Sequence, residues 1–531
     1  MSDAAPLCAS LEHLGPAALT VGCAGIRLTP AKKSWTGPAP SPFSRFVACI
    51  LVGLLHASNK NSKMPVQPER ALEPRSAKDI LGHPRGLATL AGTELWERIS
   101  FHGMVALLTL YMADQLLLPG HIEKIVGFAT YRHLVEIITG PLSIQALATQ
   151  TFGIYIGLIY FTPVIGGLLG DRLLGRRNAV ILGCILMTLG HFSMAFDQSF
   201  LLALLLLILG AGFLRGNLIA QVGALYSDGD TRSTHAMQIY YFMVNLGGFV
   251  APLITGALSQ SYGWHYGFGF AGIGMLVGLV IYLVGAPHLP QGAPRKVVAR
   301  ERRLNATERR TVAALLLLMP LLTLYWVVNS QEWNTYNIWA QDHIDLAILG
   351  WQMPVAWVQS LASLAAVALV PVVLLFWRWL AAMGREPDEI GKLKLGCLIM
   401  AGFTALDGLS TWIFGAPHQV PLLWIVITDL GESFGYLHVQ PVAIALFARM
   451  APPTIRAMMI GVYFLTVFFG GLISGRLGGL YDHWSATNFW LLHAGIVCLA
   501  GVLFPVFGKS LRSLSARKHL DEIGGGLQTN N

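Results

Sequence analysis

The sequence predicts an all-α integral membrane protein with twelve transmembrane helices arranged as two six-helix bundles. Of the 531 residues, 54% are hydrophobic and only 12% are charged, whereas soluble domains carry about twice that share of charge. Twelve segments are apolar over the length of about 20 residues that a helix needs to cross about 30 Å of hydrocarbon. A basic, proline-containing stretch at residues 288–310 separates six segments from six, a layout typical of transporters built from two related halves.

The predicted spans alternate with connections of unequal charge, and an even number of spans places both chain ends on one side. Arginine and lysine gather in one alternating set of connections, while the other set holds little besides Lys124 and Arg132. By the positive-inside rule, both termini are predicted to be cytoplasmic and the membrane to be the plasma (inner) membrane. The spans are centred near residues 102, 156, 187, 213, 246, 276, 325, 366, 402, 435, 467 and 499.

Residues 1–85 fall outside this arrangement. Their apolar run at 46–55 is too short to span a membrane and begins too far along the chain for a signal peptide. The surrounding Pro- and Ala-rich sequence has no packing period, so we predict a disordered cytoplasmic extension, with Met64 as an alternative start. The predicted divisions are the extension 1–85, a first bundle 86–287, a linker 288–310, a second bundle 311–512 and a cytoplasmic tail 513–531.

Composition and motifs argue against several other classes of protein. The six cysteines lack the spacing of a disulfide framework or a zinc site, and no cofactor or metal is predicted. The formal net charge of +8 lies in loops without an aromatic-interleaved basic stripe, which argues against nucleic-acid binding. No HExxH or GxSxG motif is present, so an intramembrane enzyme is not favoured.

The first span carries an unusual charged face in the stretch TELWERISFHGM. Glu94, Glu97, Arg98, Phe101 and His102 fall on one broad side of a helix. One ionisable group at a helix centre costs about 2.5 to 3.5 kcal/mol if it faces lipid, so these groups are predicted to face water or one another. Glu94 precedes Arg98 by one turn, the favourable orientation for an ion pair. A purely structural pair that fixes this helix to a neighbour is the alternative interpretation.

The charged stretch ELWERISFHG resembles the ExxER[FI]xYYG signature of the proton-dependent oligopeptide transporter (POT/PTR) family, a branch of the major facilitator superfamily. GAGFLRGN (210–217) is similar to the GxGxxKPN of the family's fourth helix, and YYFMVNLGGFVAPLI (240–254) to the FYxxINxG of its fifth. QPVAIALFARMAP and MMIGVYFL match the tenth and eleventh helices. The resemblance covers residues 86–510 and identifies the chain as a divergent member.

A further match, GGLLGDRLLGRR (166–177), resembles the superfamily's loop motif between the second and third helices. The resemblance implies that Asp171 caps a helix end and that Arg176 and Arg177 anchor the cytoplasmic surface. Near the other end of the chain, the glycines of 470–479 predict close contacts between helices. The matched residues of the loop motif are Gly167, Asp171, Arg172, Gly175, Arg176 and Arg177.

The resemblance implies roles for matched residues, and two departures alter them. In the family, a fourth-helix lysine pairs with a tenth-helix glutamate, but these positions are Arg215 and Tyr436 here. Glu432 lies one turn before Tyr436, about 6 Å along the axis. Because arginine reaches farther than lysine, we hypothesise that Arg215 pairs with Glu432.

Two more charged positions of the family have changed together. A first-helix arginine of peptide-transporting members is Val105, and the seventh-helix glutamate is Ser330. Losing both members of an ion pair leaves no buried charge unpaired. It also removes a cation that could bind a peptide carboxylate. The identity of the substrate is therefore open.

The sequence predicts a proton-coupled symporter, not an enzyme, that imports di- and tripeptides or similar zwitterions by alternating access between two halves. Its partners are the substrate, protons and the lipid bilayer, no cofactor acts beyond the proton gradient, and a monomer is expected. The alternatives are a proton-coupled carrier of an amino-acid conjugate, nitrate or a drug, and a non-transporting membrane sensor. The predicted proton-coupling residues are Glu94, Glu97, Arg98, Glu432 and His102. The predicted substrate-binding residues are Arg98, Phe101, Tyr160, Arg215, Asn245, Gln331, Trp333, Asn334, Asp429, Glu432 and Tyr436.

Overall fold

The computed structural model describes residues 18–22, 25–29, 79–80, 82–227, 230–290, 304–415 and 417–509. It divides into two units, Met1–Arg75 and Ser76–Asn531. In the first unit, β1 (Ala18–Gly22) and β2 (Gly25–Thr29) form an antiparallel pair. The rest of the predicted extension up to residue 78, including Met64, lies outside the described residues, as do residues 291–303 of the predicted linker and the whole predicted tail.

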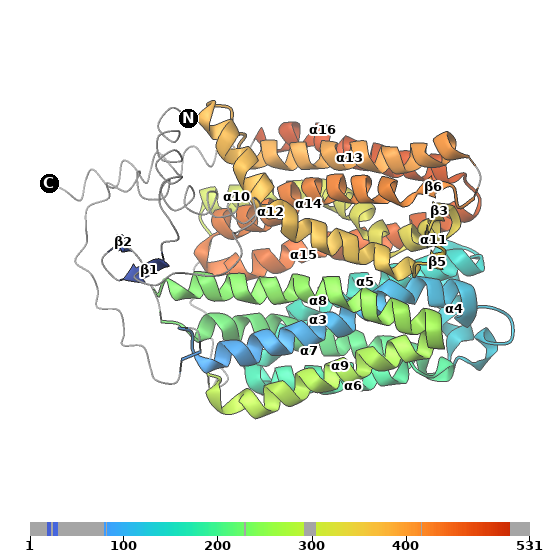
Figure 1. Cartoon of the computed structure of the whole chain (residues 1–531), viewed down its shortest axis with the longest axis horizontal. Helices are drawn as coiled ribbons and strands as arrows, with labels where there is room; N and C mark the ends of the chain where they lie inside the picture. Colours follow the sequence, from blue (N-terminus) through green and yellow to red (C-terminus); the bar gives the residue numbers. More distant parts are fainter. Residues whose placement is uncertain are drawn as a thin grey trace. The chain divides into compact units, whose positions relative to one another are not determined.

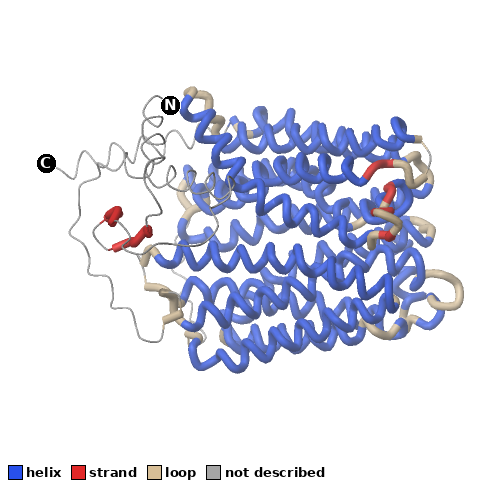
Figure 2. The backbone as a smooth tube through the Cα atoms, viewed as in Figure 1, coloured by secondary structure: helices blue, strands red, loops and turns tan. Residues whose placement is uncertain are grey.

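The described part of the second unit is almost entirely helical (Figures 1 and 2). Its long α-helices are α3 (Arg85–Tyr111), α5 (Ile144–Leu169), α6 (Arg176–Ser193), α7 (Phe200–Ala224), α8 (Arg232–Tyr262), α9 (Trp264–Gly285), α10 (Ala306–Asn329), α12 (Val358–Ala382), α13 (Glu389–Phe414), α14 (Leu422–Met450), α15 (Arg456–Gly478) and α16 (Ala486–Phe507). The shorter α-helices are α4 (Phe128–Thr139) and α11 (Thr335–His343).

Short segments connect these helices. The two-residue strands are β3 (Ile344–Asp345), β4 (Ala347–Ile348), β5 (Trp351–Gln352) and β6 (Val420–Pro421). Strand β3 pairs with β6 in parallel, and β4 pairs with β5 in antiparallel orientation. The 3₁₀ and π-helical turns are η1 (Met112–Leu116), η2 (Ile122–Lys124), η3 (Gly170–Leu174), η4 (Asp197–Ser199), η5 (Ala286–His288), η6 (Ser330–Trp333), η7 (Val355–Trp357), η8 (Pro453–Ile455) and η9 (Gly479–Asp482).

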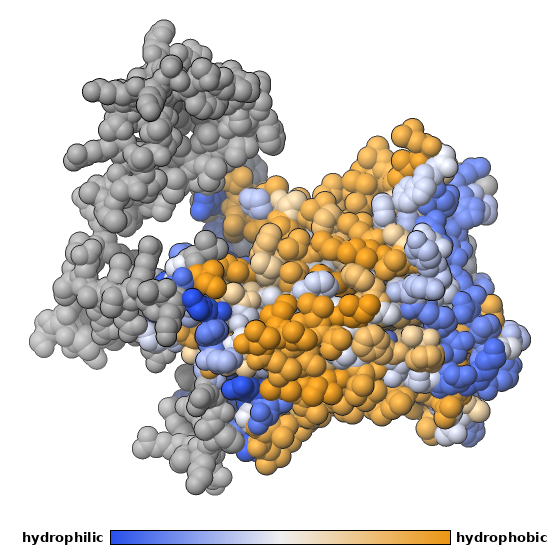
Figure 3. Space-filling model, turned by 60° about the horizontal axis from the view of Figure 1, so that its bottom comes forward, coloured by the Kyte–Doolittle hydropathy of each residue, from blue (hydrophilic) through white to orange (hydrophobic). Residues whose placement is uncertain are grey.

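The surface of the helical unit has the polarity of a membrane protein. A wide apolar belt covers the middle of the helices, and hydrophilic residues gather at their ends (Figure 3). In the described residues, nine helices are long and apolar enough to cross a membrane. The long helices outside these nine are α3, α6 and α14, and two of them carry the buried ionisable groups described below. The belt and the apolar helices identify a multi-pass membrane protein.

The long helices pack in two groups, which we call the N half (α3 to α9) and the C half (α10 to α16). Within the N half, α3 packs against α8 and α9, and α6 against α7; within the C half, α13 packs against α14 and α16. The halves meet mainly where α5 lies against α15 and α8 lies against α12 (Figure 1).

Glycines allow α5 and α15 to approach closely. A Cβ atom added to Gly153 would lie 2.5 Å from the carbonyl oxygen of Gly471 and 2.7 Å from the Cα of Gly475. A Cβ atom on Gly157 would lie 2.9 Å from the carbonyl oxygen of Phe468. Backbones that approach this closely leave no room for any other residue. The prediction that the 470–479 glycines make close helix contacts is confirmed.

The two ends of the helical unit differ in how they join the halves. We name them the Arg85 face, where α3 begins, and the Tyr111 face, where α3 ends (Figure 1). Among the described residues, every hydrogen bond between the halves lies toward the Tyr111 face. The bonded pairs are Thr109 with Asn334, Asn334 with Thr149, Asn337 with Ala106, Gln341 with Asp114, Ser143 with Asp482, Thr149 with Gly475, Arg476 with Thr139, Gln260 with Gln352 and Trp357 with Leu253.

Candidate functional site

A charged network of four residues lies between α3 and α7 in the N half. Arg98 Nε donates to Glu94 Oε1 at 2.7 Å and lies 2.9 Å from Glu97 Oε2. Arg215 Nε donates to Glu97 Oε1 at 3.1 Å. The side chains of Glu94 and Glu97 are almost completely buried. The predicted pair between Glu94 and Arg98 is confirmed, and the two carboxylates together balance the two guanidinium groups.

Tyr240 completes this network from α8, a residue for which the sequence predicted no role. Its hydroxyl donates to Glu94 Oε2 at 2.5 Å, so both oxygens of Glu94 have a partner. Helix α8 comes close to α3 because Gly247 packs against it, since an added Cβ would lie 2.5 Å from the Cβ of Arg98. The sequence held one signal, because Tyr240 stands where the family's FYxxINxG signature has a phenylalanine.

Aromatic rings extend the network toward the C half. The Cζ atom of Arg215 lies 4.1 Å from the ring centre of Phe101 and 5.8 Å from that of Tyr160, within the range of cation–π interactions. The ring of Tyr160 stacks on Phe464 of α15 at 6.3 Å between centres. The structure therefore brings together Arg98, Phe101, Tyr160 and Arg215, four of the residues predicted to bind substrate.

The predicted ion pair between Arg215 and Glu432 is wrong for this structure. Arg215 Nε donates to Glu97 Oε1 on the neighbouring helix α3. Glu432 Oε1 instead accepts a hydrogen bond from Thr404 Oγ1 at 2.6 Å. Arg215 pairs with Glu97 because α7 packs beside α3. Arg215 keeps two buried donors, Nη1 and Nη2, that lack a partner among the described residues.

The C half holds its own ionisable groups, which we call the C-half acidic cluster: Glu332, Asp407, Asp429 and Glu432. Tyr336 donates to Asp429 Oδ1 at 3.0 Å, and Asn329 Nδ2 lies 3.4 Å from Glu332 Oε2. In the part of the chain that the structure describes, no basic side chain forms an ion pair with this cluster. Glu332 and Asp407 were not among the predicted site residues.

Four more of the predicted site residues lie on α3, α8, η6 and α14, and in the described part of the chain their side chains form no hydrogen bond or ion pair with the charged network. Asn245 Nδ2 donates to the backbone oxygen of Tyr241 at 2.8 Å, and the ring of His102 lies 6.4 Å from that of Trp333. Tyr436 is half-buried on α14. Their roles in binding or coupling remain predictions.

Two other predicted residues are fully buried and bonded to protein groups. Gln331 Nε2 donates to the backbone oxygen of Ser474 at 3.0 Å. Asn334 Nδ2 donates to that of Thr149 at 3.2 Å. In this conformation both amides hold helices together, so a contact with substrate would require these bonds to open. Their predicted role in binding is untested.

The loop motif lies between α5 and α6 at the Arg85 face. Arg176 Nε donates to Asp171 Oδ1 at 2.8 Å. Gly175 precedes α6 with a φ of 75°, a conformation that glycine adopts without strain. No side chain caps the start of α6, so Asp171 pairs with Arg176 rather than serving as the expected cap of this helix. Gln221 Nε2 lies 3.4 Å from the backbone oxygen of Arg176 and links the motif to α7.

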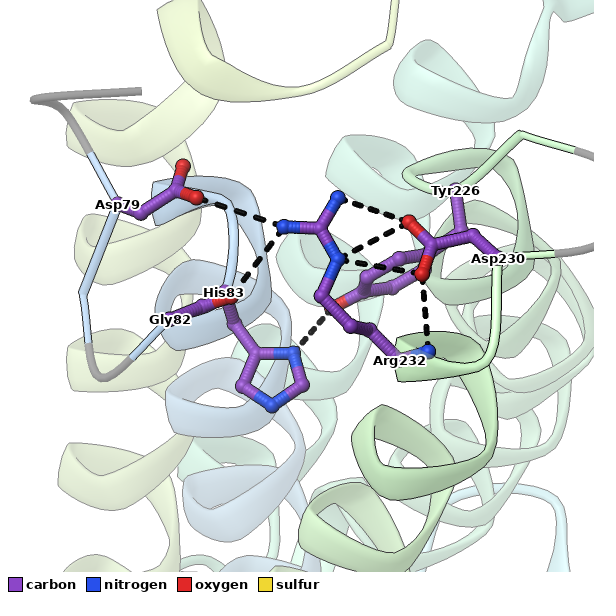
Figure 4. Close-up of polar contacts among 6 residues, drawn as sticks. All are labelled: Asp79, Gly82, His83, Tyr226, Asp230 and Arg232. Carbon is purple, nitrogen blue, oxygen red and sulfur yellow. Dashed lines mark hydrogen bonds and ion pairs between the residues drawn. The ribbon is translucent and has the colours of Figure 1, made fainter. Parts of the chain in front are cut away.

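A pocket of about 540 Å³ opens at the Arg85 face between the end of α7 and the start of α8. Beside it, Arg232 binds both oxygens of Asp230 and reaches Asp79 and the backbone oxygen of Gly82, while His83 Nδ1 lies 2.9 Å from the Tyr226 hydroxyl (Figure 4). These contacts fix the segment before α3 to the α7–α8 connection. The residues that line the pocket are Gly223, Tyr226, Ser227, Ser233, Thr234, Met237, Gln238 and Tyr241.

Neighbouring groups shift the pKa values of His83 and Asp230. Burial and the positive charges of Arg232 and His235 lower the pKa of His83 below its ordinary value. The hydrogen bonds from Arg232 lower the pKa of Asp230. Around neutral pH, these shifts favour a neutral imidazole beside an ionised carboxylate and its arginine.

Two groups of long apolar helices, one of which holds a buried charged network, define a polytopic membrane carrier. The sequence pattern of the POT family (PTR2) matches residues 177–302 and 295–491, more than half of the chain. The protein therefore belongs to the POT family.

Curated relatives agree with this assignment. The chain is 27% identical to the uncharacterized transporter YclF of Bacillus subtilis, over 82% of this chain and 97% of the relative. It is 27% identical to the peptide transporter YePEPT of Yersinia enterocolitica, over 76% of this chain and 89% of the relative. It is 26% identical to a di-/tripeptide transporter of Lactococcus lactis, over 83% and 98%.

Solved structures resemble the fold. A crystal structure of the peptide transporter POT in complex with sulfate superposes with a TM-score of 0.71 at 25% identity, covering 82% of this chain and 97% of that one. The POT family transporter PepTSo superposes with a TM-score of 0.68 at 18% identity, covering 82% and 99%. The second likeness concerns the fold alone.

Proposed function

We propose that this protein is a proton-coupled symporter that imports di- and tripeptides or similar zwitterions by alternating access. The observation that carries the proposal is the charged network of Glu94, Glu97, Arg98 and Arg215, buried in the N half. Arg215 lies over the ring of Tyr160, which stacks on Phe464 of the C half. Buried ions inside a membrane protein mark a substrate or proton pathway. Membership of the POT family and the named peptide transporters among the relatives support the same activity.

The two halves offer complementary chemistry to a zwitterion. Arg215 has two buried donors that find no partner among the residues the structure describes, and they are suited to a carboxylate or a peptide carbonyl. The C-half acidic cluster offers carboxyl groups to an ammonium group. A cargo held between them would contact both halves, so its binding would favour closure of the halves around it.

Coupling to protons follows from the shared carboxylates. Glu97 holds Arg215 and Arg98 together, and protonation of Glu97 would remove the charge that binds both guanidinium groups. A freed Arg215 could then turn toward the carboxylate of a cargo. Glu94, Glu432 and His102 are further candidate carriers of a proton.

We further propose that twelve helices cross the plasma (inner) membrane in two bundles, 86–287 and 311–512, joined by the 288–310 linker without two additional helices between them. Both termini would be cytoplasmic. The hydrogen bonds between the halves lie toward the Tyr111 face, so this conformation would be closed to the outside. No cofactor besides the proton gradient and no second subunit are required.

Val105 and Ser330 favour a second candidate, a proton-coupled carrier of a non-peptide solute. Neither residue bears the charge that peptide-transporting members have at its position, and the side chain of Val105 is fully buried. The candidate cargoes are an amino-acid conjugate, nitrate or a drug.

Counterflow in proteoliposomes tests the proposal. A dipeptide library is supplied with and without an inward acid gradient, using protein-free liposomes as the control. We expect a subset of dipeptides to exchange, and to accumulate only when the gradient is imposed. Peptide movement that is independent of the gradient would argue for a facilitator, and no response to any peptide would favour the non-peptide solutes.

A further inference from the structure

The C-half acidic cluster brings four carboxyl groups together from three parts of the fold. Glu332 lies on η6, Asp407 on α13, and Asp429 and Glu432 on α14. Thr404, which donates to Glu432, precedes Asp407 by three residues on α13, and Asp429 precedes Glu432 by three residues on α14. Burying several carboxyl groups near one another is costly unless their oxygens find hydrogen-bond donors.

Two members of the cluster have carboxyl oxygens without a hydrogen-bond partner in the described part of the chain. The side chain of Asp407 is 1% exposed and that of Asp429 is 5% exposed. Both carboxyl oxygens of Asp407 and the Oδ2 atom of Asp429 have no hydrogen-bond partner among the described residues. Buried polar atoms are nearly always bonded to protein, water or a ligand. These three oxygens are therefore acceptors that a bound donor could satisfy.

The hydrogen bonds that the cluster does have come from neutral donors: Asn329, Tyr336 and Thr404. The N half differs, because Glu94 and Glu97 are matched there by two arginines. The four carboxyl groups of the C half have no basic partner among the described residues. A zwitterion with one amino group would contact only some of these carboxyl groups.

We propose that the C-half acidic cluster selects cargo with a second cationic group, so that peptides containing lysine or arginine bind more tightly than neutral or acidic ones. This inference rests on the proposed function and adds its substrate class. The peptide carboxylate would lie toward Arg215, and the ammonium groups of the amino terminus and the basic side chain toward Asp407, Asp429 and Glu432. Both cationic groups would donate to oxygens that otherwise have no partner.

Binding to the purified full-length protein in detergent tests the proposal, with Ala-Ala, Ala-Lys, Ala-Glu and the diamine cadaverine as probes. We expect the Kd of Ala-Lys to be at least about tenfold below that of Ala-Ala, and Ala-Glu to bind most weakly. In Asp407→Asn, the ratio of the two Kd values should fall to within about twofold of one. Asp345→Asn, which alters an exposed carboxyl of β3, is the matched control and should keep the wild-type ratio.

The outcomes separate this inference from the proposed function. Equal Kd values for Ala-Lys, Ala-Ala and Ala-Glu in the wild type would overturn the inference and leave peptide transport standing. Binding of cadaverine alone, lost in Asp407→Asn, would support cation selection and contradict peptide transport. If Asp407→Asn does not fold, Asp429→Asn and Glu432→Gln carry the same measurement. A wild-type preference for Ala-Lys in both of those folded variants would overturn the inference.

Discussion

The hydroxyl of Tyr240 donates to Glu94 Oε2 at 2.5 Å, while Arg98 Nε donates to the other oxygen of Glu94 at 2.7 Å. One carboxylate therefore ties α8 to the charged face of α3. Without the hydroxyl, Glu94 Oε2 would be a buried acceptor with no donor, and an unsatisfied group of this kind costs more than the bond itself contributes. Tyr240 thus holds Glu94 in the geometry in which it binds Arg98.

Substitution of Tyr240 by Phe is expected to lower stability by about 1 to 2 kcal/mol and to reduce proton-driven uptake severalfold. The ring still fits, since phenylalanine is the family residue at this position, so the effect isolates the hydroxyl. Thermal unfolding in detergent and uptake into proteoliposomes measure the two effects. The control is Tyr241→Phe, whose hydroxyl has no hydrogen bond among the described residues. Wild-type stability and uptake in Tyr240→Phe would contradict this role.

Arg215 is expected to be essential for accumulation against a gradient, because it binds Glu97 and carries two buried donors, Nη1 and Nη2, that have no partner among the described residues. Arg215→Ala should reduce gradient-driven uptake to background, while Arg215→Lys should retain a fraction, since lysine keeps the charge but loses the guanidinium fork. Arg132→Ala serves as the control, because it removes a solvent-exposed ion pair with Glu136, and exposed pairs of this kind contribute little to stability. Wild-type accumulation by Arg215→Ala would remove Arg215 from the mechanism.

Local spacing explains which parts of this site could be predicted from sequence. Glu94 and Arg98 pair because residues one turn apart share a helix face, and the cost of lipid exposure makes such a pair face inward. The glycines of α15 were recognisable because only glycine permits helix backbones to touch. The long helices themselves follow from the length of each apolar segment.

The contacts that could not be predicted join residues distant in the sequence. Both Glu97 and Glu432 were possible partners of Arg215 in the sequence. The packing of α7 beside α3, which the sequence does not show, places Glu97 next to Arg215. Tyr240 reaches Glu94 because Gly247 brings α8 against α3. Glu332 joins the acidic cluster where α10 ends and η6 begins, a change of helix type with no clear signal in the sequence.

The close approach of α5 and α15 predicts a strong effect of a single methyl group. In Gly153→Ala, the new Cβ would lie 2.5 Å from the carbonyl oxygen of Gly471, so the helices must separate. The expected loss of stability is about 1 to 3 kcal/mol, measured by thermal unfolding in detergent. Gly167→Ala on the same helix is the control, because its Cβ would meet nothing within 4 Å. Equal stability of the two variants would show that α5 and α15 are not closely packed.

Asn334 is expected to keep the Tyr111 face closed. Its side chain joins the C half to Thr109 at 3.4 Å and to Thr149 at 3.2 Å. Each bond contributes about 1 kcal/mol, so Asn334→Ala should raise the population open at this face about tenfold or more. Spin labels at Glu123→Cys and Ile348→Cys, one on each half, report the opening as longer distances. Asn488→Ala, an exposed residue of α16, is the control, and unchanged distances in Asn334→Ala would contradict the prediction.

The contact between His83 and Tyr226 is expected to weaken in acid. The pKa of His83 is lowered in the folded protein. The segment before α3 therefore binds more protons when it is detached from the α7–α8 connection than when it is attached, so the stability of the attached state rises with pH. The contribution of His83 is therefore present above its ordinary pKa of 6.5 and is lost as the pH falls through the lowered pKa. The protection factors of the amides at the start of α3, corrected for the intrinsic exchange rate at each pH, should fall more between pH 7.5 and about 5 in the wild type than in His83→Gln, which cannot titrate. Identical pH dependence in both proteins would rule out this role of His83.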